Sequence, residues 1–132
     1  MELIGIGIDL VDIARVERML ARHGDRVLRR FLTERERAYV ADKARPAMHI
    51  AARIAAKEAA YKALQPLPGA RAVSWQDLEV ERETEGRPFL TLHGLARQLA
   101  FTHGPLAMEL SLSHSDATAG AVAVILRRPA PD

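Results

Sequence analysis

Four charged side chains interrupt the alanine-rich stretch IAARIAAKEAAYKAL, residues 50–64. They belong to Arg53, Lys57, Glu58 and Lys62. The stretch has no glycine or proline, which predicts a helix, and a helix that is apolar on most sides is usually buried. Glu58 and Lys62 are four residues apart and could simply pair, which stabilises a helix by about 0.2–0.5 kcal/mol. The alternative is that the protein buries this carboxylate and this ammonium group for chemistry.

A second carboxylate, that of Asp9, ends the apolar segment LIGIGID, residues 3–9. In a strand, the isoleucines of this segment lie on one face, and the glycines and Asp9 lie on the other. Asp9 could merely accept backbone hydrogen bonds from the next helix. A carboxylate beside bare backbone can instead hold a hard cation, since Mg²⁺ is often bound by one or two carboxylates plus substrate phosphates. Glu58 would be the second carboxylate, and phosphate charge could be neutralised by Arg53, Lys57 and Lys62.

The segment SLSHS, residues 111–115, ends an apolar strand with small polar side chains. His114 in such a place could be a structural histidine. Ser113 has no neighbouring glycine or acid of the kind found in a nucleophile elbow. We therefore interpret Ser113 and His114 as contacts to a phosphate or ribose group rather than as acyl-transfer machinery.

A basic stripe runs along the first predicted helix, between a possible N-cap at Asp12 and a stop at Gly24. One side of this helix is apolar, with Ile13, Val16 and Leu20. The opposite side presents three arginines and one methionine with no acidic residue among them: Arg15, Arg18, Met19 and Arg22. This side could simply be solvated, but it also suits the docking of an acidic protein by electrostatic steering and one apolar anchor.

The surrounding patterns predict the elements that must position these residues. TERE, residues 33–36, is a capping box that opens a short helix, and Pro46 separates it from the long helix. We expect further helices at 13–23 and 95–104, and strands at 3–9, 77–83, 88–94, 107–115 and 118–128. Because strands and helices do not alternate regularly, we expect an α+β fold, in which a mostly antiparallel sheet packs against a long buried helix.

Length and composition limit the number of domains and the classes of protein that this chain can belong to. The chain has 132 residues, which suits one domain over 1–127 with a frayed tail at 128–132. It contains no cysteine, which excludes disulfides and thiolate ligands. The longest apolar run, AGAVAVIL, is far short of the about 20 residues of a membrane span, and the N-terminus is too short and acidic for a signal peptide. We therefore expect a cytoplasmic protein that binds no membrane.

Five stretches occur together in the order and spacing of a known family: GIGIDLVDIARVER (5–18), FLTERE (31–36), ARIAAKEAAYKAL (52–64), GRPFLTL (86–92) and LSLSHSDATAGAVAVI (110–125). The chain resembles the holo-acyl-carrier-protein synthases, the small bacterial type of 4′-phosphopantetheinyl transferase. The resemblance covers nearly the whole chain, and the aspartate strand combined with the AAKEA…K helix is its most specific part.

The resemblance implies an enzyme of fatty acid biosynthesis that transfers 4′-phosphopantetheine from coenzyme A to a serine of apo acyl carrier protein. It implies that Asp9 and Glu58 bind Mg²⁺ and that Lys62 faces the pyrophosphate. It further implies that Arg53 and His114 contact coenzyme A. The family is typically a homotrimer with sites at subunit interfaces, and the basic first helix would receive the carrier protein. The base that removes the serine proton stays open between Glu58 and a metal-bound water.

Two departures from the family pattern are local. Ile54 replaces a frequent phenylalanine and keeps an apolar contact, and Gln65 replaces a glycine, while Pro66 supplies another helix stop.

Two other functions remain as alternatives. One is a non-catalytic module that binds acidic proteins through the first helix. The other is a nucleic-acid binder, suggested by an isoelectric point of about 9.4, although an aromatic content of 5% argues against base stacking.

Overall fold

The computed structural model describes residues 1–129 and places the alanine-rich stretch in one long helix, α4 (Pro46–Leu64). Proline is tolerated at its first turn because the N–H that proline lacks would have no partner there. Twelve of its side chains are buried, including Ala55, Ala56, Ala59, Ala60 and Ala63. The small side chains on several sides of α4 allow other elements to approach it closely, so α4 forms the centre of the fold.

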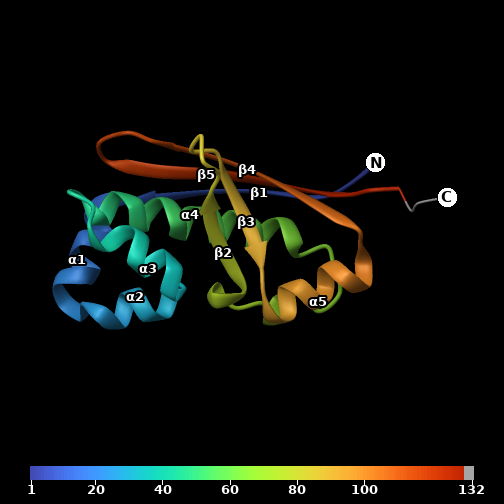
Figure 1. Cartoon of the computed structure of the whole chain (residues 1–132), viewed down its shortest axis with the longest axis horizontal. Coiled ribbons are helices and arrows are strands. Elements are labelled where there is room, and N and C mark those ends of the chain that lie inside the picture. The colour runs from blue at the N-terminus through green and yellow to red at the C-terminus, as the bar shows by residue number, and fades with distance from the viewer. Residues whose placement is uncertain (130–132) are drawn as a thin grey trace.

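One side of α4 packs against a three-stranded antiparallel sheet of order β1-β5-β4 (Figure 1). These strands are β1 (Glu2–Asp12), β4 (Leu106–His114) and β5 (Thr118–Arg127). Gly5 and Gly7 of β1 lie directly on α4. A Cβ atom at Gly7 would lie 1.9 Å from Ala59 O, and one at Gly5 would lie 2.0 Å from Ala63 O. The two glycines are therefore required for this close approach, which brings Asp9 against α4 as well.

The other face of this sheet is open and apolar. Four large side chains of β1 are between 59% and 70% exposed, which is unusual for a strand so rich in branched residues. They are Leu3, Ile6, Ile8 and Leu10.

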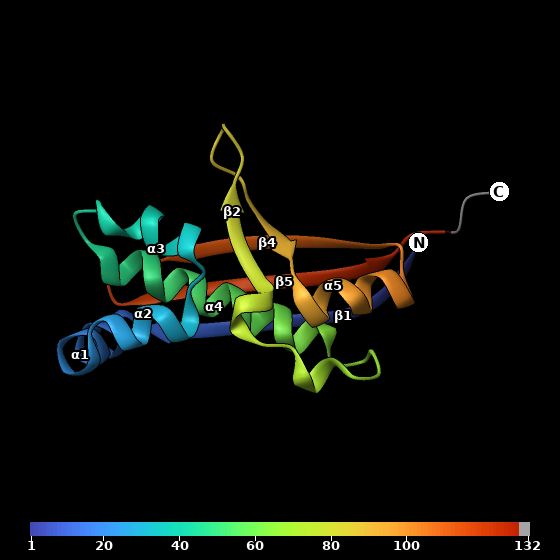
Figure 2. The ribbon, with the colours of Figure 1, turned by 60° about the horizontal axis from the view of Figure 1, so that its bottom comes forward.

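Three short helices cover one end of α4 (Figure 2). They are α1 (Ile13–His23), α2 (Asp25–Phe31) and α3 (Glu34–Ala41). The expected capping box is present at α3, where the Thr33 side chain accepts from Glu36 N and the Glu36 side chain accepts from Thr33 N. Asp12 precedes α1 as expected, but its side chain makes no capping hydrogen bond. Helix α2 was not predicted; Gly24, at φ 51°, turns the chain between α1 and α2.

The remaining elements lie near the middle and the other end of α4. The hairpin of β2 (Leu78–Arg82) and β3 (Pro88–Leu92) and the helix α5 (Gly94–His103) confirm the expected elements. Short 3₁₀ turns, Ala70–Ala72 and Trp75–Asp77, lie in the loop after α4. In the expected tail, Arg128 still donates its N–H to Pro105 O, and residues 130–132 lie outside the described part. Within the described residues, no helix has the length and apolar character needed to cross a membrane.

Candidate active site

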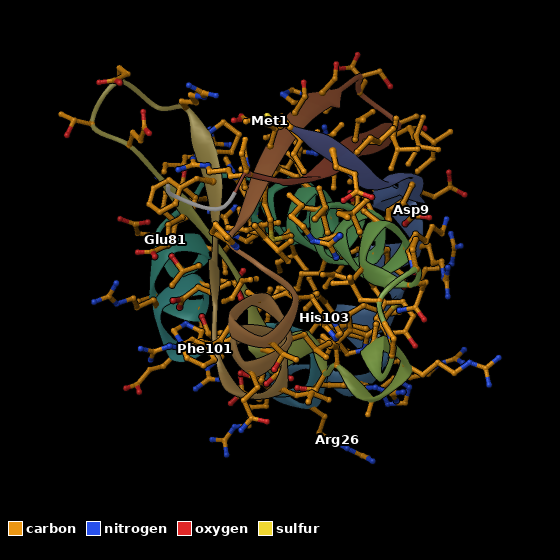
Figure 3. The ribbon with its side chains drawn as sticks, turned by 90° about the vertical axis from the view of Figure 1, so that its right-hand side faces the viewer. Met1, Asp9, Arg26, Glu81, Phe101 and His103 are labelled. Atoms are coloured by element: carbon orange, nitrogen blue, oxygen red, sulfur yellow. The ribbon has the colours of Figure 1, made fainter. Side chains whose placement is uncertain are left out.

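Asp9 and Glu58 line one pocket of about 160 Å³ between β1, α1 and α4. The pairing of β1 with the glycine face toward α4 brings Asp9 to the helix (Figure 3), and Glu58 projects from the same side of α4 as Ile54. The rest of the lining is mostly apolar and includes one cation: Leu10, Val11, Arg15, Val16, Met19, Phe31 and Ile54. The structure therefore brings together the two carboxylates that lie 49 positions apart in the sequence, at Asp9 and Glu58.

The charges in this pocket interact. Burial raises the pKa of the Glu58 carboxyl above its ordinary value, and the negative charge of Asp9 raises it further. The positive charges of Lys62 and Arg15 act in the opposite direction. Lys62 Nζ donates to Asp9 Oδ1 at 3.1 Å and to Ile8 O at 2.9 Å. The ion pair of Lys62 is therefore with Asp9 on the sheet, rather than with Glu58 one turn away on its own helix.

The two carboxylates fit a hard divalent cation. A dication would neutralise the repulsion that raises the pKa of Glu58, and carboxylate oxygens are ligands that Mg²⁺ prefers. Within residues 1–129, no group of three or more histidine, aspartate or glutamate side chains could hold a metal alone. Asp9 and Glu58 would therefore be the protein ligands, and substrate or water oxygens would supply the others.

Lys57 lies on a different side of α4 from Glu58, because consecutive residues are about 100° apart around a helix. Its side chain is fully buried, with Nζ 2.5 Å from Glu36 Oε1 and 2.9 Å from Trp75 O. Burial lowers the pKa of the Lys57 ammonium group, and the charge of Glu36 opposes this effect. The expectation that Lys57 neutralises substrate phosphate is corrected here, since its ammonium group points into the protein and joins α4 to α3.

Arg53 is also inside the protein, with 1% of its surface exposed. Its guanidinium carbon lies 4.1 Å from the centre of the Tyr39 ring, and its Nη1 donates to His49 O at 3.3 Å. Its Nε has no hydrogen-bond partner among the described residues. The contact between Arg53 and coenzyme A that the family resemblance implies stays a prediction.

Ser113 and His114 are exposed at the end of β4 and line a second pocket. Because β5 lies between β1 and β4, these residues and Asp9 are on opposite outer strands of the sheet. The second pocket also contains His49 and Arg82, which sequence reasoning missed. No short motif joins them, since one comes from α4 and the other from β2. A single chain thus holds two separate groups of predicted site residues.

The predicted basic stripe is exposed, and Met19 beside it is half-buried. Arg15 and Met19 also line a groove of about 500 Å³ between α1 and α2. This groove adds further basic residues that sequence reasoning missed, namely His23, Arg26 and Arg30; the side chain of Arg26 extends away from the body of the protein in Figure 3. The spacing of Val27, Leu28 and Phe31 is compatible with a helix and could have indicated α2.

Comparison with known proteins agrees with this fold. The model of the 4′-phosphopantetheinyl transferase superfamily matches residues 5–123. A holo-[acyl-carrier-protein] synthase of Moorella thermoacetica is 46% identical over 123 residues, covering 93% of this chain and 94% of that protein. The chain therefore belongs to the 4′-phosphopantetheinyl transferase superfamily, and holo-[acyl-carrier-protein] synthases are among its relatives.

Solved structures of such synthases have the same fold. The enzyme of Neisseria meningitidis matches with a TM-score of 0.84 at 27% identity, covering 95% of this chain and 99% of that one. The Helicobacter pylori enzyme, solved in complex with coenzyme A, matches with a TM-score of 0.77 at 33% identity, covering 92% and 99%.

Proposed function

We propose that this protein is a holo-acyl-carrier-protein synthase. It transfers 4′-phosphopantetheine from coenzyme A to a serine of apo acyl carrier protein and releases adenosine 3′,5′-bisphosphate. The observation that carries the proposal is the pocket in which Asp9 and Glu58 meet beside an exposed basic helix, in a chain of this superfamily. Cytoplasmic fatty acid biosynthesis is the part of metabolism that this product would serve.

Mg²⁺ is the proposed cofactor, with Asp9 and Glu58 as its protein ligands. When bound, it supplies a Lewis acid that offsets charge on the transferring phosphoryl group. Lys62 lies against Asp9 with its ammonium group half-exposed, so it can turn toward the pyrophosphate. The base for the proton of the attacking serine hydroxyl stays open between the Glu58 carboxylate and a water on the metal.

The carrier protein would dock on α1, through Arg15, Arg18, Met19 and Arg22. Arg15 and Met19 line both the carboxylate pocket and the groove between α1 and α2. A partner that is acidic and presents one apolar side chain would match this surface in charge and shape. Its serine would then lie close to the pyrophosphate held at Asp9 and Glu58.

A homotrimer is part of the proposal. The open apolar face of β1 is of the kind that marks an interface, because water-exposed side chains such as Ile6 and Ile8 favour burial. The separation of His114 from Asp9 and Glu58 also favours assembly. A neighbouring subunit would supply Ser113 and His114 to the carboxylate pocket, so that each site forms between two chains.

One assay tests the proposed activity. The protein is incubated with coenzyme A, Mg²⁺ and apo acyl carrier protein, and intact-mass spectrometry looks for added phosphopantetheine. We expect stoichiometric modification of the serine that depends on both Mg²⁺ and coenzyme A. Binding of the carrier protein without modification would instead favour the non-catalytic module.

A further inference from the structure

Phe31, the last residue of α2, lies where the carboxylate pocket meets the groove between α1 and α2. Of the residues that the structure describes, three line both: Arg15, Met19 and Phe31. Arg15 and Met19 come from α1, so Phe31 is the contribution of α2 to this junction. Its ring is half-buried, which leaves part of its surface to a docked partner. A partner chain that reaches from the groove to the carboxylates would pass this ring.

Helix α2 is too short to hold the ring in place by itself. It has seven residues, and isolated helices shorter than about 12 residues are marginal in water. The carbonyl groups at the end of a helix also have no partner within it. Gln76 supplies one from another element, because its Nε2 donates to Arg29 O at 2.8 Å and to Leu32 O at 2.7 Å. The end of α2 is thus tied to the 3₁₀ turn Trp75–Asp77.

Trp75, in the same turn, supports the ring of Phe31 directly. The centres of the two rings are 5.9 Å apart, and their planes make an angle of 41°, as in favourable aromatic pairs. The ring of Tyr61 on α4 lies 5.9 Å from that of Trp75 as well. The backbone of Trp75 is also fixed, since its oxygen accepts from the buried Lys57 Nζ at 2.9 Å. These contacts connect α4 to the turn and the turn to Phe31.

The surroundings of Phe31 in the groove indicate what could pack on it. The groove is basic, with His23, Arg26 and Arg30 beside Arg15, and none of its lining residues that the structure describes is acidic. The guanidinium carbon of Arg30 lies 5.6 Å from the centre of the Phe31 ring. An acidic protein with an apolar side chain among its carboxylates matches this surface in charge and in polarity.

We propose that Trp75 and Gln76 are positioning residues for the carrier protein: they hold Phe31 at the junction, where its ring packs against an apolar side chain near the acceptor serine. This inference rests on the proposed function. It assigns a role in docking to a turn that lines neither the carboxylate pocket nor the groove. The turn would act on the partner only through the end of α2.

Steady-state kinetics of the full-length protein test the proposal, because lost support for Phe31 should weaken docking and spare the chemistry. Trp75→Leu should raise the KM for carrier protein roughly three- to ten-fold, the scale of a lost aromatic pair. It should leave kcat and the KM for coenzyme A within about two-fold of the wild type. Trp75→Phe keeps a ring against Phe31 and should restore most of the wild-type KM.

Gln76→Met is a second variant, which removes both hydrogen bonds to α2 at an exposed position and keeps the length of the side chain. It should raise the KM for carrier protein by about three-fold, the scale of a lost hydrogen bond. Gln98→Met, at an exposed position of α5, is the matched control and should change neither constant. Circular dichroism confirms that each variant is folded, and Gln76→Met decides if Trp75→Leu does not fold.

A double variant tests whether Trp75 acts through Phe31. Phe31→Leu alone should raise the KM for carrier protein, and the addition of Trp75→Leu should raise it no further, because the supported ring is already absent. Effects of the two substitutions that multiply would show that Trp75 acts by another route, which would overturn the positioning role.

The fluorescence of Trp75 gives a direct view of this contact, because it is the single tryptophan of the chain. Titration of the wild type with a carrier protein that lacks tryptophan should change the emission saturably, since docking covers the ring that Trp75 touches. The change should be smaller in Phe31→Leu. If saturating carrier protein leaves the emission of the wild type unchanged, the assignment of Phe31 is overturned.

The outcomes separate this inference from the proposed function. If the wild type modifies carrier protein and the KM for it is unchanged in Trp75→Leu and Gln76→Met, or if the KM for coenzyme A rises as much, the positioning role alone is overturned. If the wild type binds carrier protein without modifying it, the proposed function fails. Weaker binding by both variants in titration calorimetry would then still support the positioning role, and unchanged binding would overturn it. If the wild type neither modifies nor binds carrier protein, both are overturned.

Discussion

At the scale of single residues, the site depends on a carboxylate held in an unfavourable environment. Glu58 is half-buried next to Asp9, and both conditions disfavour its charged form. The glycines of β1 and the alanines of α4 allow the strand and the helix to pack in close contact. This close contact keeps Glu58 beside Asp9. Such an arrangement costs stability and serves metal binding and catalysis.

Removal of either carboxylate should nearly abolish transfer. We expect Asp9→Ala and Glu58→Ala each to lower kcat/KM by more than about 100-fold, because the lost group acts in the transition state. Circular dichroism should show an intact fold, since both side chains face a pocket rather than the close-packed core. Wild-type turnover by either variant at saturating Mg²⁺ would show that the metal assignment is wrong.

The raised pKa of Glu58 has two consequences for pH dependence. A carboxyl whose pKa is raised in the folded chain destabilises the fold as pH rises through that pKa, so Glu58→Gln should raise the Tm of the metal-free protein at neutral pH. The control, Glu85→Gln in the exposed β2–β3 turn, should leave the Tm unchanged. In the wild type, the Mg²⁺ concentration for half-maximal activity should increase as pH falls, because protons compete for Glu58. A Mg²⁺ requirement that does not depend on pH would contradict this.

At the scale of elements, most of the fold follows from local patterns. The two-residue period of LIGIGID, the alanine content of α4 and the capping box at Thr33 correctly predicted a strand, a buried helix and a helix start. The burial of Lys57 and Arg53 could not be predicted in the same way. Their charge suggested a ligand, whereas the partners that bury them, Glu36 and Tyr39, come from α3, and sequence spacing does not show how α3 packs on α4.

The buried pair of Lys57 and Glu36 should be a major determinant of stability. Glu36 also accepts hydrogen bonds from Thr33 N and Val80 N, so Lys57→Met would leave a buried carboxylate without its counter-charge. We expect a loss of about 3–5 kcal/mol in the free energy of unfolding, measured with urea, and a partial recovery when Glu36→Gln is added. Arg35→Gln, which breaks the exposed pair with Glu81, should cost less than about 1 kcal/mol. If Lys57→Met and Arg35→Gln lower the free energy of unfolding by the same amount, burial of the Lys57–Glu36 pair does not determine its contribution to stability.

At the scale of the whole molecule, the charge distribution separates partner docking from coenzyme binding. A net charge of +2 conceals a strongly basic surface on α1 and α2. We expect Arg22→Glu to raise the KM for carrier protein roughly ten-fold and to leave the KM for coenzyme A nearly unchanged. Added salt should raise the KM of the wild type for carrier protein, because exposed charges are screened over about 8 Å at physiological ionic strength.

Arg22 tests docking more cleanly than Arg15, because Arg15 also lines the carboxylate pocket and lowers the pKa of Glu58. Arg71→Glu, a charge reversal at an exposed loop position outside both pockets, is the matched control. If Arg22→Glu leaves the KM for carrier protein unchanged, the carrier protein docks elsewhere and the arginines of α1 form only a solvated helix face.

The division of the predicted site between opposite edges of the sheet makes assembly testable by mixing. Glu58→Ala should be nearly inactive when purified alone, and His114→Ala should lose most of its activity when coenzyme A is kept well below its KM. If a site takes Glu58 from one subunit and His114 from the next, some sites in mixed trimers contain both wild-type residues. Random assortment of equal amounts should restore roughly a quarter of the wild-type activity, because each of the two residues is present in half of the subunits.

The rescue requires exchange of subunits, so the two variants are unfolded and refolded together, and sedimentation confirms the trimer. A mixture of Glu58→Ala with Asp9→Ala is the control. These two residues lie in one pocket of one chain, so no mixed trimer can restore them together. Rescue in the first mixture and none in the second would place His114 across the interface from Glu58. Full activity in a monomer, or no rescue in trimers shown to be mixed, would mean that each chain carries its own complete site and that the apolar face of β1 has another purpose.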